Sequence, residues 1–99
     1  MIVIAGTVRI RPEAREATIR AASTMAQATR REAGCNRYHF AFDVEDPALV
    51  HIIEEWDSAE ALAAHFQSPH MAAFQQAMPG VVAGAPEIKR YEVASAAAL

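Results

Sequence analysis

The side chains most able to move a proton lie between residues 38 and 70 of this chain. They are the phenol of Tyr38, the carboxylate of Glu54 and the imidazole of His65, with the indole of Trp56 just after Glu54. An imidazole can accept a proton from a bound phenol near neutral pH, and a carboxylate on an apolar strand face needs a partner. Two interpretations stay open: a proton-transfer site, or a structural network in which Glu54 bonds the Tyr38 hydroxyl or a helix end and His65 is a hydrogen-bonded core residue.

Structural roles are indicated for His39, His51 and the single cysteine, and no metal site is indicated for His70. His70 follows His65 across an expected helix break, which is poor geometry for a shared metal ion, and no acidic or cysteine ligand stands beside the pair. We therefore expect no metal site. His39 and His51 alternate onto the opposite strand face, where interface hydrogen bonding is expected, and Cys35 has no CxxC partner, which favours simple packing.

The common cofactor and nucleophile motifs are missing from this sequence. The segment from Gly80 to Gly84 lacks the lysine and the strand-to-helix setting of a phosphate-binding loop, so it is interpreted as an ordinary loop. The chain has no dinucleotide fingerprint, no serine nucleophile elbow and no flavin motif. Few conventional chemistries therefore remain.

Strand and helix periods predict the elements that position these side chains. The predicted elements are a strand at 2–10, a helix from Pro12 that stops at Gly34, strands at 37–44 and 48–56, a helix capped by Asp57 or Ser58, a further helix from Ser68-Pro69 to about Met78, and a strand at 87–93. The first helix is expected to bury a stripe of Ile19, Ala22, Ala26, Thr29 and Ala33. Residues 78–86 are expected to form a loop, and residues 94–99 a loose tail.

A hairpin that turns about Asp46 sets the register of the two middle strands. The expected pairs are Tyr38 with Glu54, Phe40 with Ile52 and Phe42 with Val50. This register places Tyr38, Glu54 and Trp56 on one strand face. Ala41, Leu49 and Ile53 then make the other face apolar as well.

The length and composition predict one domain with a sizeable core. The chain has 99 residues, of which 53% are hydrophobic and 21% charged, and it carries a formal net charge of -3. It has no basic stripe for nucleic acid, no apolar run of about 20 residues for a membrane and no leader-like start. We expect a cytoplasmic protein that binds neither nucleic acid nor membrane, with a single domain over residues 1–93.

The element order of strand, helix, strand, strand, helix, strand predicts an α+β fold of the ferredoxin-like split βαβ type. All helices then cover one face of the sheet. The second apolar face needs a partner, and the same face of another copy would bury several hundred Å² of apolar surface, worth on the order of 10 kcal/mol before the costs of association. We therefore expect a symmetric homodimer.

Several short motifs carry a family resemblance over residues 2–93. They are Gly34-Cys35-Asn36-Arg37-Tyr38, Asp46-Pro47, Glu54-Glu55-Trp56, Ala61-Leu62 with His65, and Ser68-Pro69-His70 with Phe74. Their combination resembles the antibiotic biosynthesis monooxygenase family. The resemblance implies a dimeric α+β barrel built from two ferredoxin-like chains, each with a cleft between its sheet and its helices.

The resemblance also implies an activity. Enzymes of this family oxygenate phenolic, quinol or polyketide-type aromatic substrates with dioxygen and use no cofactor, because the substrate supplies the electrons. The residues expected to do this are His65, Glu54 and Tyr38 as catalytic groups and Trp56, Phe74, Phe40 and His70 as substrate-binding groups.

Two alternatives to this activity remain. One is a noncatalytic dimer that binds a small molecule or acts in a stress response. The other is a haem-degrading monooxygenase, to which Trp56 and His65 would carry over. Residues 2–10 lack the asparagine that the haem-degrading branch uses on its first strand, which disfavours that alternative.

Overall fold

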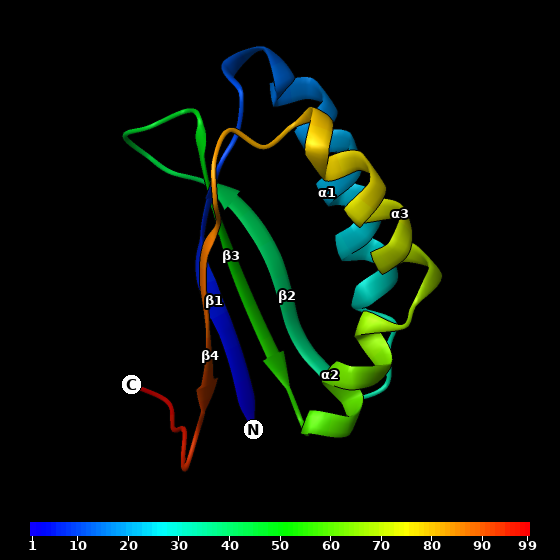
Figure 1. Cartoon of the computed structure of the whole chain (residues 1–99). Helices are drawn as coiled ribbons and strands as arrows, with labels where there is room; N and C mark the ends of the chain where they lie inside the picture. The colour runs from blue at the N-terminus through cyan, green and yellow to red at the C-terminus, as the bar shows by residue number, and fades with distance from the viewer.

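A computed structural model describes residues 1–99 as one sheet with helices packed on one side (Figure 1). The elements are β1 Ile2–Arg9, the short 3-10 helix η1 Pro12–Ala14, α1 Arg15–Thr29, β2 Cys35–Phe42, β3 Leu49–Trp56, α2 Ala59–Phe66, α3 Pro69–Ala77, the 3-10 helix η2 Met78–Gly80, and β4 Glu87–Glu92. No regular element follows Glu92. We call the helix-covered side of the sheet the inner face and the bare side the outer face.

The sheet has four strands in the order β2-β3-β1-β4, and every neighbouring pair is antiparallel. This arrangement confirms the ferredoxin-like α+β fold. The hairpin register is confirmed as well: Tyr38 pairs with Glu54, Phe40 with Ile52 and Phe42 with Val50. β1 extends the row that contains Tyr38 and Glu54, since Ile4 lies between Glu54 and Arg90. The inner face therefore carries a phenol, a carboxylate and a guanidinium in one line.

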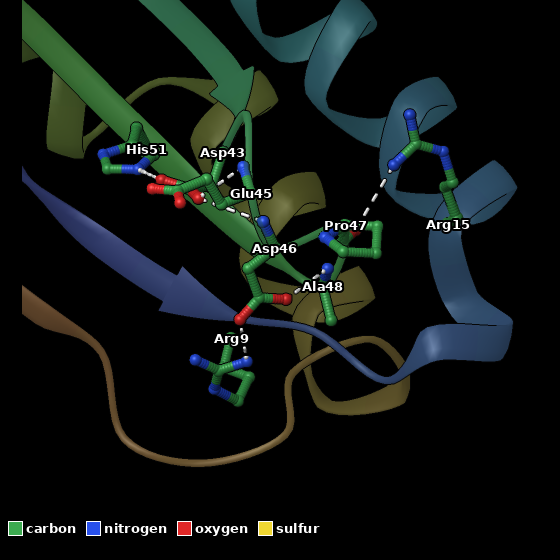
Figure 2. A network of polar contacts seen from close by, with 8 residues as sticks. All are labelled: Arg9, Arg15, Asp43, Glu45, Asp46, Pro47, Ala48 and His51. Atoms are coloured by element: carbon green, nitrogen blue, oxygen red, sulfur yellow. Dashed lines mark hydrogen bonds and ion pairs between the residues drawn. The ribbon is translucent and has the colours of Figure 1, made fainter.

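Acidic side chains hold the hairpin turn between β2 and β3 (Figure 2). Asp43 accepts the backbone N–H groups of Glu45 and Asp46, and Asp46 accepts that of Ala48. Side chains then tie this turn to both neighbouring strands: Arg9 pairs with Asp46 and His51 with Asp43, each at 2.8 Å. A turn with this many local hydrogen bonds fixes the strand register, which explains why the pairing was predictable.

The first helix is shorter than its periodicity indicates. α1 ends at Thr29, and the chain continues through tighter turns in which Glu32 N–H bonds the carbonyl of Thr29. The Arg30 side chain donates to the Tyr38 carbonyl at 2.7 Å, which draws this segment toward β2. Gly34 takes the left-handed conformation (φ +82°), as predicted, although five residues beyond the helix end.

The buried stripe of α1 also differs from the prediction. Thr18, Met25, Ala26 and Thr29 are buried, whereas Ile19 is 39% exposed and Ala33 is exposed. Thr18 can face the interior because its hydroxyl donates to the Ala14 carbonyl within its own helix at 2.8 Å. The prediction placed Ile19 on the buried stripe because Ile19 is the larger apolar residue. It did not include the hydrogen bond that allows Thr18 to be buried instead.

The core consists of two clusters on the inner face. The larger contains Ile2, Met25, Ala26, Tyr38, Trp56 and Leu62, and the smaller contains Ile10, Ala14, Val50 and Val81. Cys35 packs against the larger cluster, as its sequence setting predicts. Since Tyr38 and Trp56 belong to this cluster, the candidate site is built into the core rather than placed on a loop.

Candidate active site

A largely apolar cleft lies between the inner face and helices α2 and α3. It consists of two adjoining cavities of about 340 and 410 Å³ that share Ile52, Met71, Phe74 and Ile88 in their walls. Phe40 faces Phe74 across the larger cavity, with ring centroids 5.6 Å apart. Volumes of this size accept a small aromatic molecule. The cleft lies between the sheet and the helices, where the family resemblance implies one.

Polar groups converge at one end of this cleft. Tyr38 and Glu54 reach it from paired positions on β2 and β3, and His65 reaches it from α2. Arg90 of β4 lines the same cavity from the other edge of the sheet. The structure therefore brings together the three residues predicted to be catalytic and adds a positive charge that the sequence analysis missed.

Glu54 is held by the neighbouring indole. Its side chain is 6% exposed, and Oε1 accepts the Trp56 Nε1–H at 2.9 Å. Burial raises the pKa of Glu54 above its ordinary value, while the Trp56 hydrogen bond and the nearby His65 act in the opposite direction. The expected partner was the Tyr38 hydroxyl or a helix end, and that expectation is wrong. Residues two apart on one strand share a face, so Trp56 is close enough to serve instead.

The Tyr38 phenol remains neutral in this environment. Burial, followed by the negative charge of Glu54, raises its pKa well above the ordinary range. The residue lines the cleft from β2. A neutral phenol in this position can donate a hydrogen bond to a molecule bound beside it.

His65 is fixed on its far side by a carboxylate. Its side chain is 1% exposed, and Nδ1 lies 2.7 Å from Glu32 Oε2. A carboxylate accepts, so this bond assigns the ring proton to Nδ1 and leaves Nε2 with a free lone pair. The imidazole is held between Trp56 and Tyr38, at centroid distances of 4.9 and 5.5 Å. A fixed ring with an unprotonated nitrogen is the arrangement that a general base requires.

The same Glu32 oxygen also bonds a second histidine. His70 Nε2 lies 2.7 Å from Glu32 Oε2, and the three ligand atoms all lie within 4.8 Å of one another. The expectation that no acidic group stands beside His65 and His70 is therefore wrong. No spacing signal could have revealed Glu32, since it is 33 residues from His65 in sequence and lies in the turn after α1.

Two predicted substrate-binding residues stand outside the cleft in this structure. Trp56 is completely buried and contacts Glu54 and His65 from behind, so it supports the site rather than lining it. His70 lines a separate groove of about 300 Å³ between α1 and α3. Phe40 and Phe74 do line the cleft, as expected.

Membrane insertion through a helix has no support in the structure, because none of the helices combines the length and the apolar character needed to cross a bilayer.

Sequence comparisons show what this chain is similar to. The model of the antibiotic biosynthesis monooxygenase family matches residues 1–77. The uncharacterized protein sll1783 of Synechocystis is 33% identical over 93 residues, which covers 94% of this chain but only 63% of that longer protein. The Escherichia coli protein named probable quinol monooxygenase YgiN is 29% identical over 92 residues, covering 83% of this chain and 88% of YgiN.

Solved structures share the whole fold. A Deinococcus radiodurans protein described as a candidate antibiotic biosynthesis monooxygenase superposes with a TM-score of 0.89 at 28% identity, covering 100% of this chain and 98% of that one. Rv0793 of Mycobacterium tuberculosis has the same TM-score at 22% identity, with 98% of each chain covered, and this similarity concerns the fold alone.

Proposed function

Because this chain belongs to the antibiotic biosynthesis monooxygenase family, we propose that it oxygenates a small phenol or quinol with dioxygen and needs no bound cofactor. The observation that carries the proposal is the imidazole of His65, which lines a largely apolar cleft while its Nδ1 is bonded to Glu32. A phenol bound in this part of the cleft would lie beside the His65 imidazole. The name of the YgiN relative supports a quinol as the substrate class.

The proposed reaction begins with proton transfer to His65. Nε2 accepts the hydroxyl proton of the substrate, and Glu32 stabilises the imidazolium that forms. The neutral Tyr38 phenol donates a hydrogen bond to the substrate oxygen, and Arg90 places a positive charge on the same side of the cavity. Glu54 is buried in the same wall, where burial raises its pKa and the Trp56 N–H holds Oε1 in place.

Electrons for dioxygen come from the substrate anion itself. The anion passes its electrons to dioxygen, and a carbon–oxygen bond forms at a ring carbon that carries hydrogen. The O–O bond then breaks as water leaves, with one proton returned by His65 and the other supplied by that ring carbon. A quinol and dioxygen thus give a hydroxyquinone and water, and the atoms balance without an external reductant. The apolar walls around Phe40 and Phe74 reduce the contact of the reacting groups with water.

The test is oxygen consumption by the purified, colourless protein with a panel of quinols. We expect uptake of one dioxygen per quinol without added flavin, haem or metal, and loss of turnover by about 10²–10⁴-fold in His65→Ala. His51→Asn, which alters an exposed histidine of the hairpin, serves as the control. Tight binding of a phenol without any oxygen uptake would instead support a noncatalytic binding dimer.

We also propose that the protein works as a homodimer joined through the outer face. Ala5, Leu49 and Ile53 place apolar side chains on this face, and no element of the same chain covers them (Figure 1). An uncovered apolar sheet face in a small domain is an expected association surface. The catalytic groups all lie on the inner face, so each chain carries a complete cleft.

A further inference from the structure

Glu32, His65 and His70 form a compact set of metal-ligating side chains that the proposed reaction does not need as a whole. Glu32 Oε2 lies 2.7 Å from His65 Nδ1 and 2.7 Å from His70 Nε2, and no pair of the three ligand atoms is more than 4.8 Å apart. The side chains come from the turn after α1, from α2 and from the first turn of α3. Three elements of the fold therefore converge on one point.

We infer that this triad is a site for a first-row divalent transition metal of the zinc type, and that the metal inhibits the enzyme. Two imidazoles and one carboxylate make a nitrogen-rich ligand set, which suits zinc, cobalt, nickel or copper and does not suit magnesium or calcium. Three protein ligands leave a fourth position for water or an anion. The inhibitory part of this inference rests on the proposed function of His65.

Coordination requires the three ligand atoms to rearrange. Ligand atoms that share one metal at about 2.0–2.1 Å in tetrahedral geometry stand about 3.3 Å apart. Each nitrogen–oxygen separation must therefore open by about 0.6 Å beyond 2.7 Å, and the two nitrogens, which lie within 4.8 Å of each other, must take that same separation. Glu32 lies beyond the last residue of α1, in a turn whose backbone is less constrained than a helix. His65 is buried and rigid, so Glu32 and His70 are the ligands that move.

An entry path exists that does not pass through the substrate cleft. His70 and Glu32 keep 21% and 17% of their side-chain surface exposed, whereas His65 keeps 1%. His70 also lines the groove of about 300 Å³ between α1 and α3. A hydrated cation can therefore reach the three ligands through the groove between α1 and α3, whether or not a substrate occupies the cleft.

Metal binding at this point changes which nitrogen of His65 carries the proton. Without metal, Glu32 holds a proton on Nδ1 and leaves Nε2 free to act as a base. A metal takes the Nδ1 lone pair, so a neutral imidazole must carry its proton on Nε2, which faces the cleft. The proton moves between the two nitrogens through solvent and is not lost. The base is then blocked, although no residue of the cleft has moved.

The binding test uses the tag-free protein titrated with Co²⁺, followed by its visible absorption, and with Zn²⁺, followed by calorimetry. We expect one metal per chain, with affinity about 10–100-fold weaker in Glu32→Gln and in His70→Asn. His51→Asn is the matched control, since His51 and Asp43 form an exposed histidine–carboxylate pair at 2.8 Å, and its affinity should be unchanged. Absence of binding at millimolar Co²⁺, an affinity of both ligand variants equal to that of the parent protein, or loss of binding in His51→Asn would each overturn the site.

A second measurement separates the metal site from the proposed function. Long-range ¹H–¹⁵N spectra report the protonated nitrogen of His65 directly, and Zn²⁺ should move the proton from Nδ1 to Nε2 whether or not any quinol is turned over. If the protein turns over a quinol, Zn²⁺ should inhibit it, and His70→Asn should raise the half-inhibitory concentration by the same factor as it weakens binding. Saturation with Zn²⁺ that leaves both the tautomer and the turnover unchanged would overturn the inhibitory role.

Discussion

Glu32 determines which nitrogen of His65 faces the cleft. The 2.7 Å bond from Nδ1 fixes both the tautomer and the orientation of a ring that is otherwise surrounded by aromatic side chains. The carboxylate itself does not line the cleft. Glu32 is therefore a positioning residue, and its removal should affect the chemical step more than substrate binding.

We predict that Glu32→Gln lowers kcat by at least about tenfold and leaves KM nearly unchanged. A neutral amide stabilises the imidazolium less than a carboxylate does, so the acid limb of the pH–rate profile should also shift to lower pH. Steady-state kinetics between about pH 5 and 9 provide both readouts. An unchanged kcat and an unchanged profile in a folded variant would show that Glu32 has a structural role only.

Glu54 makes a different prediction, which concerns stability. Burial raises its pKa above the ordinary 4.5, so the folded chain retains a proton that the unfolded chain has already lost. The stability contributed by the protonated form is complete below the unfolded pKa and decreases as the pH rises through the folded pKa. Glutamine has no proton to lose, so Glu54→Gln does not lose stability as the pH rises. Its amide oxygen can still accept the Trp56 N–H.

We therefore expect the Tm of Glu54→Gln to exceed that of the parent protein by a few degrees at pH 7 and to match it near pH 4. Thermal unfolding followed by circular dichroism at both pH values gives the comparison. Glu55→Gln is the control, because Glu55 is the neighbouring glutamate on the outer face, where it pairs with Arg37. A variant that is less stable than the parent at pH 7 would indicate that the Glu54 anion is needed by the fold.

The segment between α1 and β2 depends on one glycine. Gly34 has φ +82°, and a Cβ atom at this position would lie 2.6 Å from the Ala61 Cβ of α2. Backbone strain and a close contact therefore oppose any side chain here. Gly34 lets the segment between α1 and β2 pass close to α2. The same segment carries Glu32, which bonds His65, so the path of this segment also affects the orientation of His65.

We predict that Gly34→Ala lowers the free energy of unfolding by about 1–3 kcal/mol. The double variant Gly34→Ala with Ala61→Gly should recover part of that loss, because it removes the contact but keeps the strained φ. Gly80→Ala is the control, since a Cβ there meets nothing within 4 Å and its φ is not positive. Urea unfolding measures all three variants, and equal stability of Gly34→Ala and Gly80→Ala would contradict the argument.

Local signals made most of these elements predictable from the sequence. The strand alternation, the Asp46-Pro47 turn and the serine caps of α2 and α3 act over a few residues, and each is confirmed. The contacts of Glu32 with His65 and His70 join residues that are 33 and 38 positions apart. Local periodicity contains no information about such contacts, so the predicted site included His65 and lacked Glu32, which bonds it.

The whole molecule has one covered and one uncovered sheet face. Helices α1, α2 and α3 bury the inner face, while Val3, Ala5, Leu49 and Ile53 remain only half-buried on the outer face and Tyr91 is 47% exposed. A chain of 99 residues buries a smaller fraction of its surface on folding than a larger domain does, so an uncovered apolar face matters more for its stability. Burial of this face against a second copy would stabilise both chains and leave each cleft unobstructed on the opposite side.

We predict that Ile53→Arg converts the proposed dimer to a monomer. Under a two-fold axis the substitution places two like charges in the same apolar contact, at a cost of about 3–5 kcal/mol, which exceeds what a standard interface of modest affinity can absorb. Sedimentation velocity at several concentrations measures the change. Val44→Arg introduces the same side chain at a fully exposed apolar position in the hairpin turn and should leave the dimer intact. Quinol turnover per chain checks that the inner face of the Ile53→Arg variant is still folded. If both variants sediment as the parent dimer does, the association surface must lie elsewhere, and the half-buried apolar residues of the outer face would require another partner.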